Sequence, residues 1–331
     1  MNHRRSFTTL LAACSLALTL AATGSMAQAR EVKIALDGPP DLEKAGTYVW
    51  ANAFGKHLQA GGMAVKEYAR GSIGEEAERL DQVSQGLLEV SMSDLKAAGG
   101  LDSIAFGLML PYLFADDVQM DRSLQQGGML ERINASTTKK GVRVLAVALL
   151  GPPAGIFNTK KPVAAVADLA GLRMRALDKN QIALFQAWGT AGTIVAWPEV
   201  ANALQTGVAD GYINPPIVPL MFGHAGIIKH FTDARVAPSV RLAIASEDWY
   251  RKLSADQRKL VDAGVAKATA ANRAWLKTRD KEFQALEQAG IKVTTLSAAA
   301  RADFQKRSEP LYTSGVLSPD QVAAWKKAAA Q

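Results

Sequence analysis

Short segments with a strand pattern alternate with helical patterns along the first third of this chain. A β-rich run at 31–36 precedes a helical pattern over 48–59, a second strand at 64–69, a loop and helix over 71–86 and a third strand at 87–94. Glycines and a proline-containing turn separate these segments. This order of strand, helix and strand is typical of an α/β domain with a mostly parallel sheet.

A second set of alternating segments follows a stretch of almost continuous apolar residues at 141–150. Such a stretch indicates a strand that is buried on both faces. After a break at 151–155, the pattern predicts a strand at 171–177, a helix at 178–189, a strand at 192–196, a helix at 198–207 and a strand at 208–214. The chain therefore contains a second α/β unit.

The C-terminal part of the chain is mainly helical. Ser254 and Gln257 form a capping box, no proline follows up to Ala289, and Gly290 is a stop signal. A helix over 255–289 would extend about 50 Å at 1.5 Å per residue, which is longer than one small domain. We therefore expect it to brace two lobes, with two shorter helices beginning near Ser297 and Ser318.

The N-terminus has the pattern of a Sec-type signal peptide over residues 1–29. Two arginines precede an apolar segment at 10–22, and Ala27-Gln28-Ala29 is a cleavage site. These features predict export to the periplasm as a soluble protein. A lipoprotein anchored at Cys14 is the alternative, but the apolar segment continues past Cys14, which favours cleavage after Ala29.

Composition narrows the classes of function. Cleavage leaves 302 residues, enough for about two domains of ~150 residues each. It also removes Arg4 and Arg5 and no acid, which lowers the formal net charge from +7 to +5. Cys14 is the only cysteine, so the mature chain has no disulfide and no thiolate metal site. No basic arm or aromatic–basic pattern indicates a nucleic-acid site.

Enzyme motifs are absent from the sequence. It contains no P-loop, no G-x-G-x-x-G and no H-E-x-x-H, and the segment RGSIG is not a nucleophile elbow. His224 and His230 are six residues apart, which fits neither helical spacing of a metal pair. We predict no catalytic residue, no metal site and no cofactor.

Four segments resemble the solute-binding subunits of tripartite ATP-independent periplasmic (TRAP) transporters, the C4-dicarboxylate-binding type. They are GSIGEEAERLDQVSQGLLEVSMSD at 71–94, LPYLFAD at 110–116, VADLAGLRMRAL at 166–177 and WPEVANALQTGVADGYINP at 197–215. The resemblance implies a two-lobed periplasmic binding protein of type II-like α/β fold. Lobe I would comprise 30–152 plus 240–279, and lobe II 153–239 plus 280–331, with the long C-terminal helix bracing both.

The resemblance also implies a ligand-binding arginine. In the family, the arginine four residues after the glycine of this strand forms a bidentate ion pair with the ligand carboxylate, and here that residue is Arg175. A planar guanidinium matches a carboxylate in a way that a lysine cannot. Arg173 matches a position where the family commonly has lysine, so we expect it to be replaceable.

Further candidate contacts follow from the same resemblance and from strand ends. Asn214, Trp197 and Tyr212 fall where the family lines its cleft, although turn formation and core packing explain Asn214 and Trp197 equally well. Asp94, Lys96 and Asp37 follow strands of the first lobe, where loop surface is the alternative role.

Two departures from the family pattern affect the expected ligand. Some relatives carry a second cation where this chain has Gly155, and proline is common where it has Leu177. A single carboxylate with an apolar or hydroxylated remainder therefore fits as well as succinate, malate or a sialic acid. The expected partners are a small organic or sugar acid and the membrane permease of a TRAP transporter, and the receptor is expected to be a monomer.

Other function classes stay open at this stage. A binding protein that serves an ATP-driven importer or a sensor kinase has a similar pattern. A periplasmic enzyme on the same scaffold would need a base in the cleft. A structural or adhesion protein would have no enclosed ligand.

Overall fold

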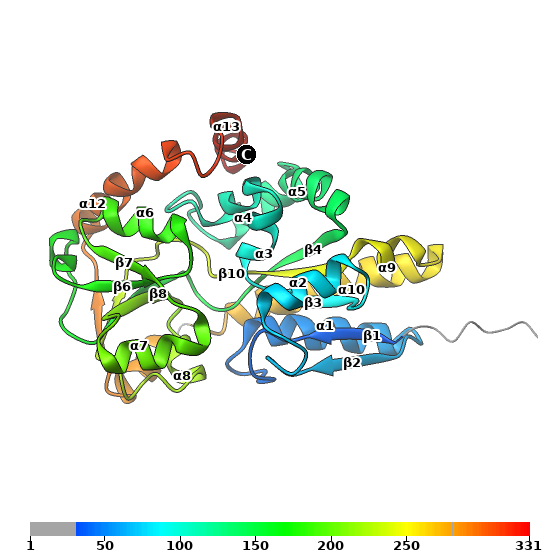
Figure 1. Ribbon diagram of the computed structural model, residues 1–331, viewed down its shortest axis with the longest axis horizontal. Coiled ribbons are helices and arrows are strands. Elements are labelled where there is room, and N and C mark those ends of the chain that lie inside the picture. Colours follow the sequence, from blue (N-terminus) through cyan, green and yellow to red (C-terminus); the bar gives the residue numbers. More distant parts are fainter. Residues whose placement is uncertain (1–30, 280) are drawn as a thin grey trace, which may run out of the picture. The chain divides into compact units, whose positions relative to one another are not determined.

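The computed structural model describes residues 31–279 and 281–331, whose strands form two sheets (Figure 1). The predicted signal peptide and Cys14 lie outside the described residues. The first sheet has the order β2–β1–β3–β10–β4, with β1 Val32–Ala35, β2 Val65–Tyr68, β3 Val90–Ser93, β4 Val142–Leu149 and β10 Val240–Ser246. The second has the order β11–β9–β5–β8–β6–β7, with β5 Gly155–Asn158, β6 Arg173–Ala176, β7 Ala191–Ile194, β8 Gly211–Asn214, β9 His230–Asp233 and β11 Lys292–Thr295.

Helices pack against both sheets, which confirms the predicted α/β class. The α-helices are α1 Gly46–Ala60, α2 Glu76–Ser84, α3 Leu95–Leu101, α4 Asp117–Gln125, α5 Met129–Thr137, α6 Lys179–Ala187, α7 Val200–Thr206, α8 Val218–Met221, α9 Glu247–Lys252, α10 Ala255–Leu276, α11 Glu282–Gln288, α12 Ala298–Ser308 and α13 Pro319–Ala329. Two short 3-10 helices matter below, η1 Ser103–Met109 and η5 Glu309–Thr313. Within the described ranges, no helix combines the length and the apolar character that crossing a bilayer requires.

One strand in each sheet runs against the others. In the first sheet β10 is antiparallel to β3 and β4, and in the second β5 is antiparallel to β8 and β9. The remaining neighbours are parallel. The chain enters β5 directly from β4 of the first sheet, and it enters β10 from β9 of the second. The reversed strands are therefore the ones that the chain enters when it passes directly from a strand of one sheet to a strand of the other.

The two crossing segments are hydrogen-bonded to each other. Leu150 N donates to Ser239 O and Ala154 N donates to Ala237 O, both at 2.9 Å. Val236 N donates to Ala154 O at 2.8 Å. The β4–β5 and β9–β10 connections thus form a single two-stranded ribbon, which we call the crossing ribbon.

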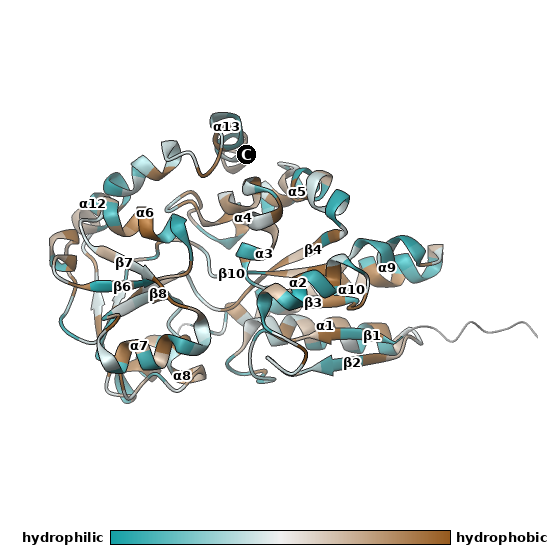
Figure 2. Ribbon diagram, viewed as in Figure 1, coloured by the Kyte–Doolittle hydropathy of each residue, from teal (hydrophilic) through white to brown (hydrophobic). Residues whose placement is uncertain are grey.

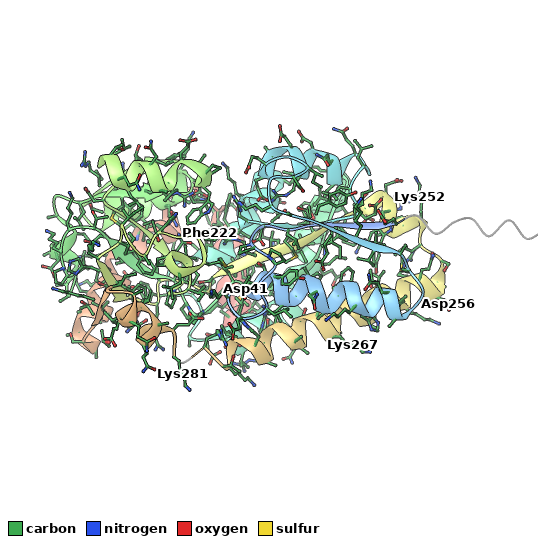
Figure 3. The ribbon with its side chains drawn as sticks, turned by 90° about the horizontal axis from the view of Figure 1, so that it is seen from below. Asp41, Phe222, Lys252, Asp256, Lys267 and Lys281 are labelled. Carbon is green, nitrogen blue, oxygen red and sulfur yellow. The ribbon has the colours of Figure 1, made fainter. Side chains whose placement is uncertain are left out.

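Helices α1 and α10 lie side by side against the first sheet (Figures 1 and 3). The sheet supplies an apolar surface, most clearly in β4, which Figure 2 colours largely brown. The side chain of Asn272 on α10 fastens the three elements together. Its Nδ2 donates to Gly46 O and Leu149 O at 2.8 and 2.9 Å, and its Oδ1 accepts from Leu149 N at 2.9 Å.

The prediction of one helix over 255–289 is wrong. Helix α10 ends at Leu276, and α11 begins at Glu282. The Thr278 hydroxyl donates to Trp275 O at 2.7 Å, so a carbonyl of the last helical turn accepts a hydrogen bond from a side chain. The Trp275 indole also donates to Glu43 O at 3.2 Å. Because α10 packs on α1 and β4 while α11 packs on β11, two successive helices take the place of the expected single brace.

The predicted lobe boundaries stay a prediction, since Glu31–Gln331 packs as one unit. Helix α13 departs from the predicted division, which assigned all of 280–331 to lobe II. It packs against α4 and η1. The Trp325 indole donates to Ile104 O at 2.7 Å and occupies the space that a side chain at Gly107 would fill. Burial of this large aromatic ring holds the last helix beside the first sheet.

We expect Gly46→Ala to lower the free energy of unfolding by about 1–3 kcal/mol, as overpacking of a filled interior does. A Cβ at this position would lie 2.2 Å from Leu149 O. Gly226→Ala is the matched control, because nothing lies within 4 Å of its Cβ position. Urea unfolding of both variants would measure the difference, and equal stability would show that α1 can shift away from β4 at little cost.

Candidate functional site

A cavity of about 520 Å³ opens where strands of both sheets end. Asp37 follows β1 and Asp94 follows β3 in the first sheet. Arg175 and Asn214 lie at the ends of β6 and β8 in the second sheet. Ligands of open α/β sheets bind beyond the carboxyl ends of strands, so this arrangement marks the cavity as a binding site.

Arg175 lies on β6, the strand next to the edge strand β7 of the second sheet, where its Cα is paired with Thr193 and Tyr212. Only 5% of its surface is exposed. Its Nε donates to Val195 O at 3.0 Å, and its guanidinium carbon lies 5.5 Å from the centroid of the Trp197 ring. These contacts orient the guanidinium but do not neutralise its charge.

The charge of Arg175 has no carboxylate partner among the described residues. Burial is the largest effect and lowers the pKa of Arg175 to about 10, with Arg241 acting in the same direction. The carboxylates of Asp94 and Asp178 oppose this shift from a distance. A buried cation without an ion pair is costly, and an anion that enters the cavity would relieve that cost.

The other predicted contact residues of the second lobe differ in whether they line the cavity. Asn214 lines the cavity, is 9% exposed, and its Nδ2 has no hydrogen-bond partner in the described structure. Trp197 also lines the cavity and packs edge-on against Phe222. Tyr212 does not line it. Its ring is fully buried behind Trp197, and its hydroxyl lies 3.3 Å from His224 Nδ1.

A second arginine reaches the cavity from the first sheet. Arg241 stands near the start of β10, and its Nε lies 3.4 Å from Asp37 Oδ2. The Arg70 guanidinium donates to Asp37 O. The positive charge of Arg241 lowers the pKa of Arg175, and both side chains line the cavity. The cavity therefore has a cationic region formed by Arg175 and Arg241.

Acidic side chains lie beside this region. Glu76 Oε1 accepts a hydrogen bond from Asp94 N at 3.2 Å, and Glu76 Oε2 pairs with Arg79 Nη2 at 2.8 Å. Burial and then the Asp94 carboxylate raise the pKa of Glu76 to about 7, while Arg79 opposes them. Asp94 also caps α3 by accepting from Lys96 N at 2.7 Å. Asp94 and Lys96 both line the cavity.

The sequence and the fold of this chain are similar to those of known proteins. Residues 42–317 match the family model DctP, described as bacterial extracellular solute-binding protein, family 7. The chain belongs to this family. The C4-dicarboxylate-binding periplasmic protein DctP of Rhodobacter capsulatus is 26% identical over 337 residues, which is 100% of both chains. The sialic acid-binding periplasmic protein SiaP of Vibrio cholerae is 24% identical over 309 residues, covering 89% of this chain and 91% of that protein.

Solved structures of TRAP periplasmic solute-binding proteins share the fold of this family 7 protein. The one from a Polaromonas species, bound to D-erythronate, has a TM-score of 0.81 at 23% identity and covers 89% of this chain and 98% of its own. The one from Sulfurospirillum deleyianum, with bound succinate, has a TM-score of 0.80 at 21% identity and covers 89% and 97%. The predicted resemblance to TRAP solute-binding proteins is thereby confirmed.

In this family 7 protein the two arginines of the strand at 171–177 differ in their surroundings. The Arg173 side chain is 56% exposed and pairs with Asp210, Nε to Oδ2, at 3.3 Å. Arg175 is buried at the cavity. Gly155 offers no room for a second cation, since a Cβ there would lie 2.4 Å from both Phe231 and Thr232 O. No metal-binding group of three or more His, Cys, Asp or Glu side chains occurs among the described residues.

Five charged residues that line the cavity were not predicted from the sequence, namely Arg70, Glu75, Glu76, Asp178 and Arg241. Their places in the sequence do not give the directions of their side chains. The apolar run that contains Arg241 was the available signal, because an arginine within a buried strand needs a reason.

We expect the stability of the protein to fall as pH rises through about 7, partly because of Glu76. Its pKa is raised from 4.5 to about 7 on folding, so its stabilising contribution is present below about pH 4.5 and is lost as the pH rises through 7. Glu76→Gln stays neutral and should show a smaller fall of the melting midpoint between about pH 5 and pH 8. Calorimetry would compare it with the exposed control Glu131→Gln. A slope identical to wild type for Glu76→Gln would contradict the assignment.

Proposed function

We propose that this chain is a receptor for a small organic carboxylate, which it binds through Arg175. The observation that carries the proposal is an arginine that is only 5% exposed, lines a cavity and lacks a carboxylate partner among the described residues. A ligand carboxylate would complete the pair with two parallel N–H···O bonds. D-Erythronate and succinate, the ligands named for two structures of the same fold, are both carboxylates.

Two groups near Arg175 would also bind the carboxylate head group of the ligand. The Nδ2 of Asn214 needs an acceptor, which a carboxylate or α-hydroxyl oxygen would supply. Arg241 adds a second positive charge from the first sheet, although Asp37 partly neutralises it. A ligand bound to Arg175 and Arg241 would connect the two sheets. Binding would then favour the arrangement in which they are closest.

The proposal extends to transport. Membership of an extracellular solute-binding family supports export to the periplasm, with cleavage after Ala29, and delivery of the ligand to a TRAP membrane permease. It favours this role over service to an ATP-driven importer and over an enzyme. The receptor is further proposed to act as a monomer.

Arg175→Ala should weaken carboxylate binding at least about 30-fold, because loss of one partner of a buried charge pair costs about 2–5 kcal/mol. Arg175→Lys should recover little, since an ammonium cannot form the paired hydrogen bonds. Arg173→Ala is the matched control and should bind like wild type, because Arg173 pairs with Asp210 outside the cavity.

Thermal shift and calorimetry with erythronate, glucuronate, succinate, pantoate and butyrate would measure these effects. A ligand at a hundredfold excess over its Kd stabilises the native state by about 2.7 kcal/mol. Undiminished binding by Arg175→Ala would remove Arg175 from the site, and thermal shifts only with neutral sugars or amines would refute a carboxylate ligand.

A further inference from the structure

The lining of the cavity changes character from one group of segments to another. The charged residues that line it come from residues 37–96, from the segment 175–178 and from Arg241. By contrast, the segments 106–111 and 311–317 contribute no charged side chain to the lining. The polar head-group region thus occupies only part of the cavity.

We define the apolar end by five lining residues from four elements or connections. They are Leu80 of α2, Phe106 and Met109 of η1, Leu311 of η5 and Val316 of the connection to α13. Each is half-buried. Four of them pack against the core cluster of the first sheet, while Leu311 packs against a cluster of the second. The apolar end thus forms a wall of the cavity that is backed by the core clusters of both sheets.

The wall is built on a fixed base. The ring of Phe106 occupies the space beside Gly99, where a Cβ would lie 2.4 Å from it. The Tyr312 hydroxyl donates to Pro111 O at 2.9 Å and ties η5 to the segment after η1. Leu80 stands one helical turn after Glu76 on the same face of α2, so the change from polar to apolar lining occurs along one helix.

We propose that the ligand is a monocarboxylate with an extended apolar tail, and that its tail binds at the apolar end. This inference rests on the proposed function, because the head group is the carboxylate held by Arg175. A cavity of about 520 Å³ falls within the range of small-molecule sites and has room for more than a carboxylate head. The tail is an alkyl chain or an aryl ring, which needs no hydrogen bonds.

The chemistry of the wall discriminates between classes of acid. Hydroxyl groups of a sugar acid would lose water at Phe106, Met109 and Val316 without gaining a donor or acceptor from these side chains. A methylene placed there gains about 0.8 kcal/mol, which corresponds to about a fourfold lower Kd for each added CH₂. A second carboxylate would meet no cation in the segments 106–111 and 311–317.

The test uses the full mature chain and titration calorimetry with acetate, butyrate, hexanoate, octanoate and 3-phenylpropionate. Gluconate, glucuronate and succinate serve as hydrophilic comparisons. We expect Kd to fall about fourfold per methylene until the cavity is full, and we expect hexanoate or phenylpropionate to bind at least tenfold more tightly than gluconate.

Two near-isosteric variants locate the tail. Met109→Gln and Val316→Thr place polar atoms in the wall with little change in volume, and both should reduce the dependence of Kd on chain length. Val118→Thr makes the same change at a side chain that is 57% exposed and outside the cavity, so it should leave that dependence unaltered. Ligand-free melting curves establish that each variant folds.

The outcomes separate this inference from the proposed function. If gluconate, glucuronate or succinate binds best and its binding depends on Arg175, the apolar tail is refuted and the carboxylate receptor stands. The tail site would also be refuted if Met109→Gln and Val316→Thr left the dependence of Kd on chain length unchanged. The wall residues would then contact each other rather than the ligand. If no acid binds in an Arg175-dependent way, both proposals fail.

Discussion

The cavity is organised around a positive charge that folding removes from water without supplying an acid. Such a group is tolerable only where hydrogen bonds orient it and where an anion can reach it. Val195 O and the Trp197 ring meet the first condition, and the cavity meets the second. The nearby carboxylates have other partners. Asp37 pairs with Arg241 and Asp94 caps α3, so neither forms an ion pair with Arg175.

Much of this arrangement could be predicted from the order of segments. Asp37 and Asp94 were candidates because they follow strands of the first sheet, with loop surface as the alternative, and Asn214 was a candidate from the family resemblance. All three line the cavity. The contrast between Arg173 and Arg175 came from the family resemblance alone, because residues two apart lie on the same face of a strand. Tyr212 shows the limit of such reasoning. It lies in the same strand as Asn214, but its side chain is fully buried and does not line the cavity.

What escaped prediction depended on long-range geometry. Arg241 stands near the start of its strand, and it reaches the cavity only because β10 runs against its neighbours. No local pattern encodes that reversal. The break after α10 has no proline or glycine to announce it, and the Thr278 hydroxyl donates to Trp275 O at this end of the helix. The apolar end contains Leu80, Phe106 and Val316, which come from distant parts of the chain. The hydrophobic pattern marks them only as core positions and does not show that they line one cavity.

The crossing ribbon has a mechanical consequence. Two connections that are bonded at Leu150, Ala154 and Val236 cannot slip past each other without breaking several backbone hydrogen bonds. Sliding of one sheet along the other is thereby resisted, whereas bending of the ribbon leaves those bonds intact. The ribbon thus favours rotation of one sheet relative to the other over sliding, and such a rotation opens and closes a cavity without shearing its walls.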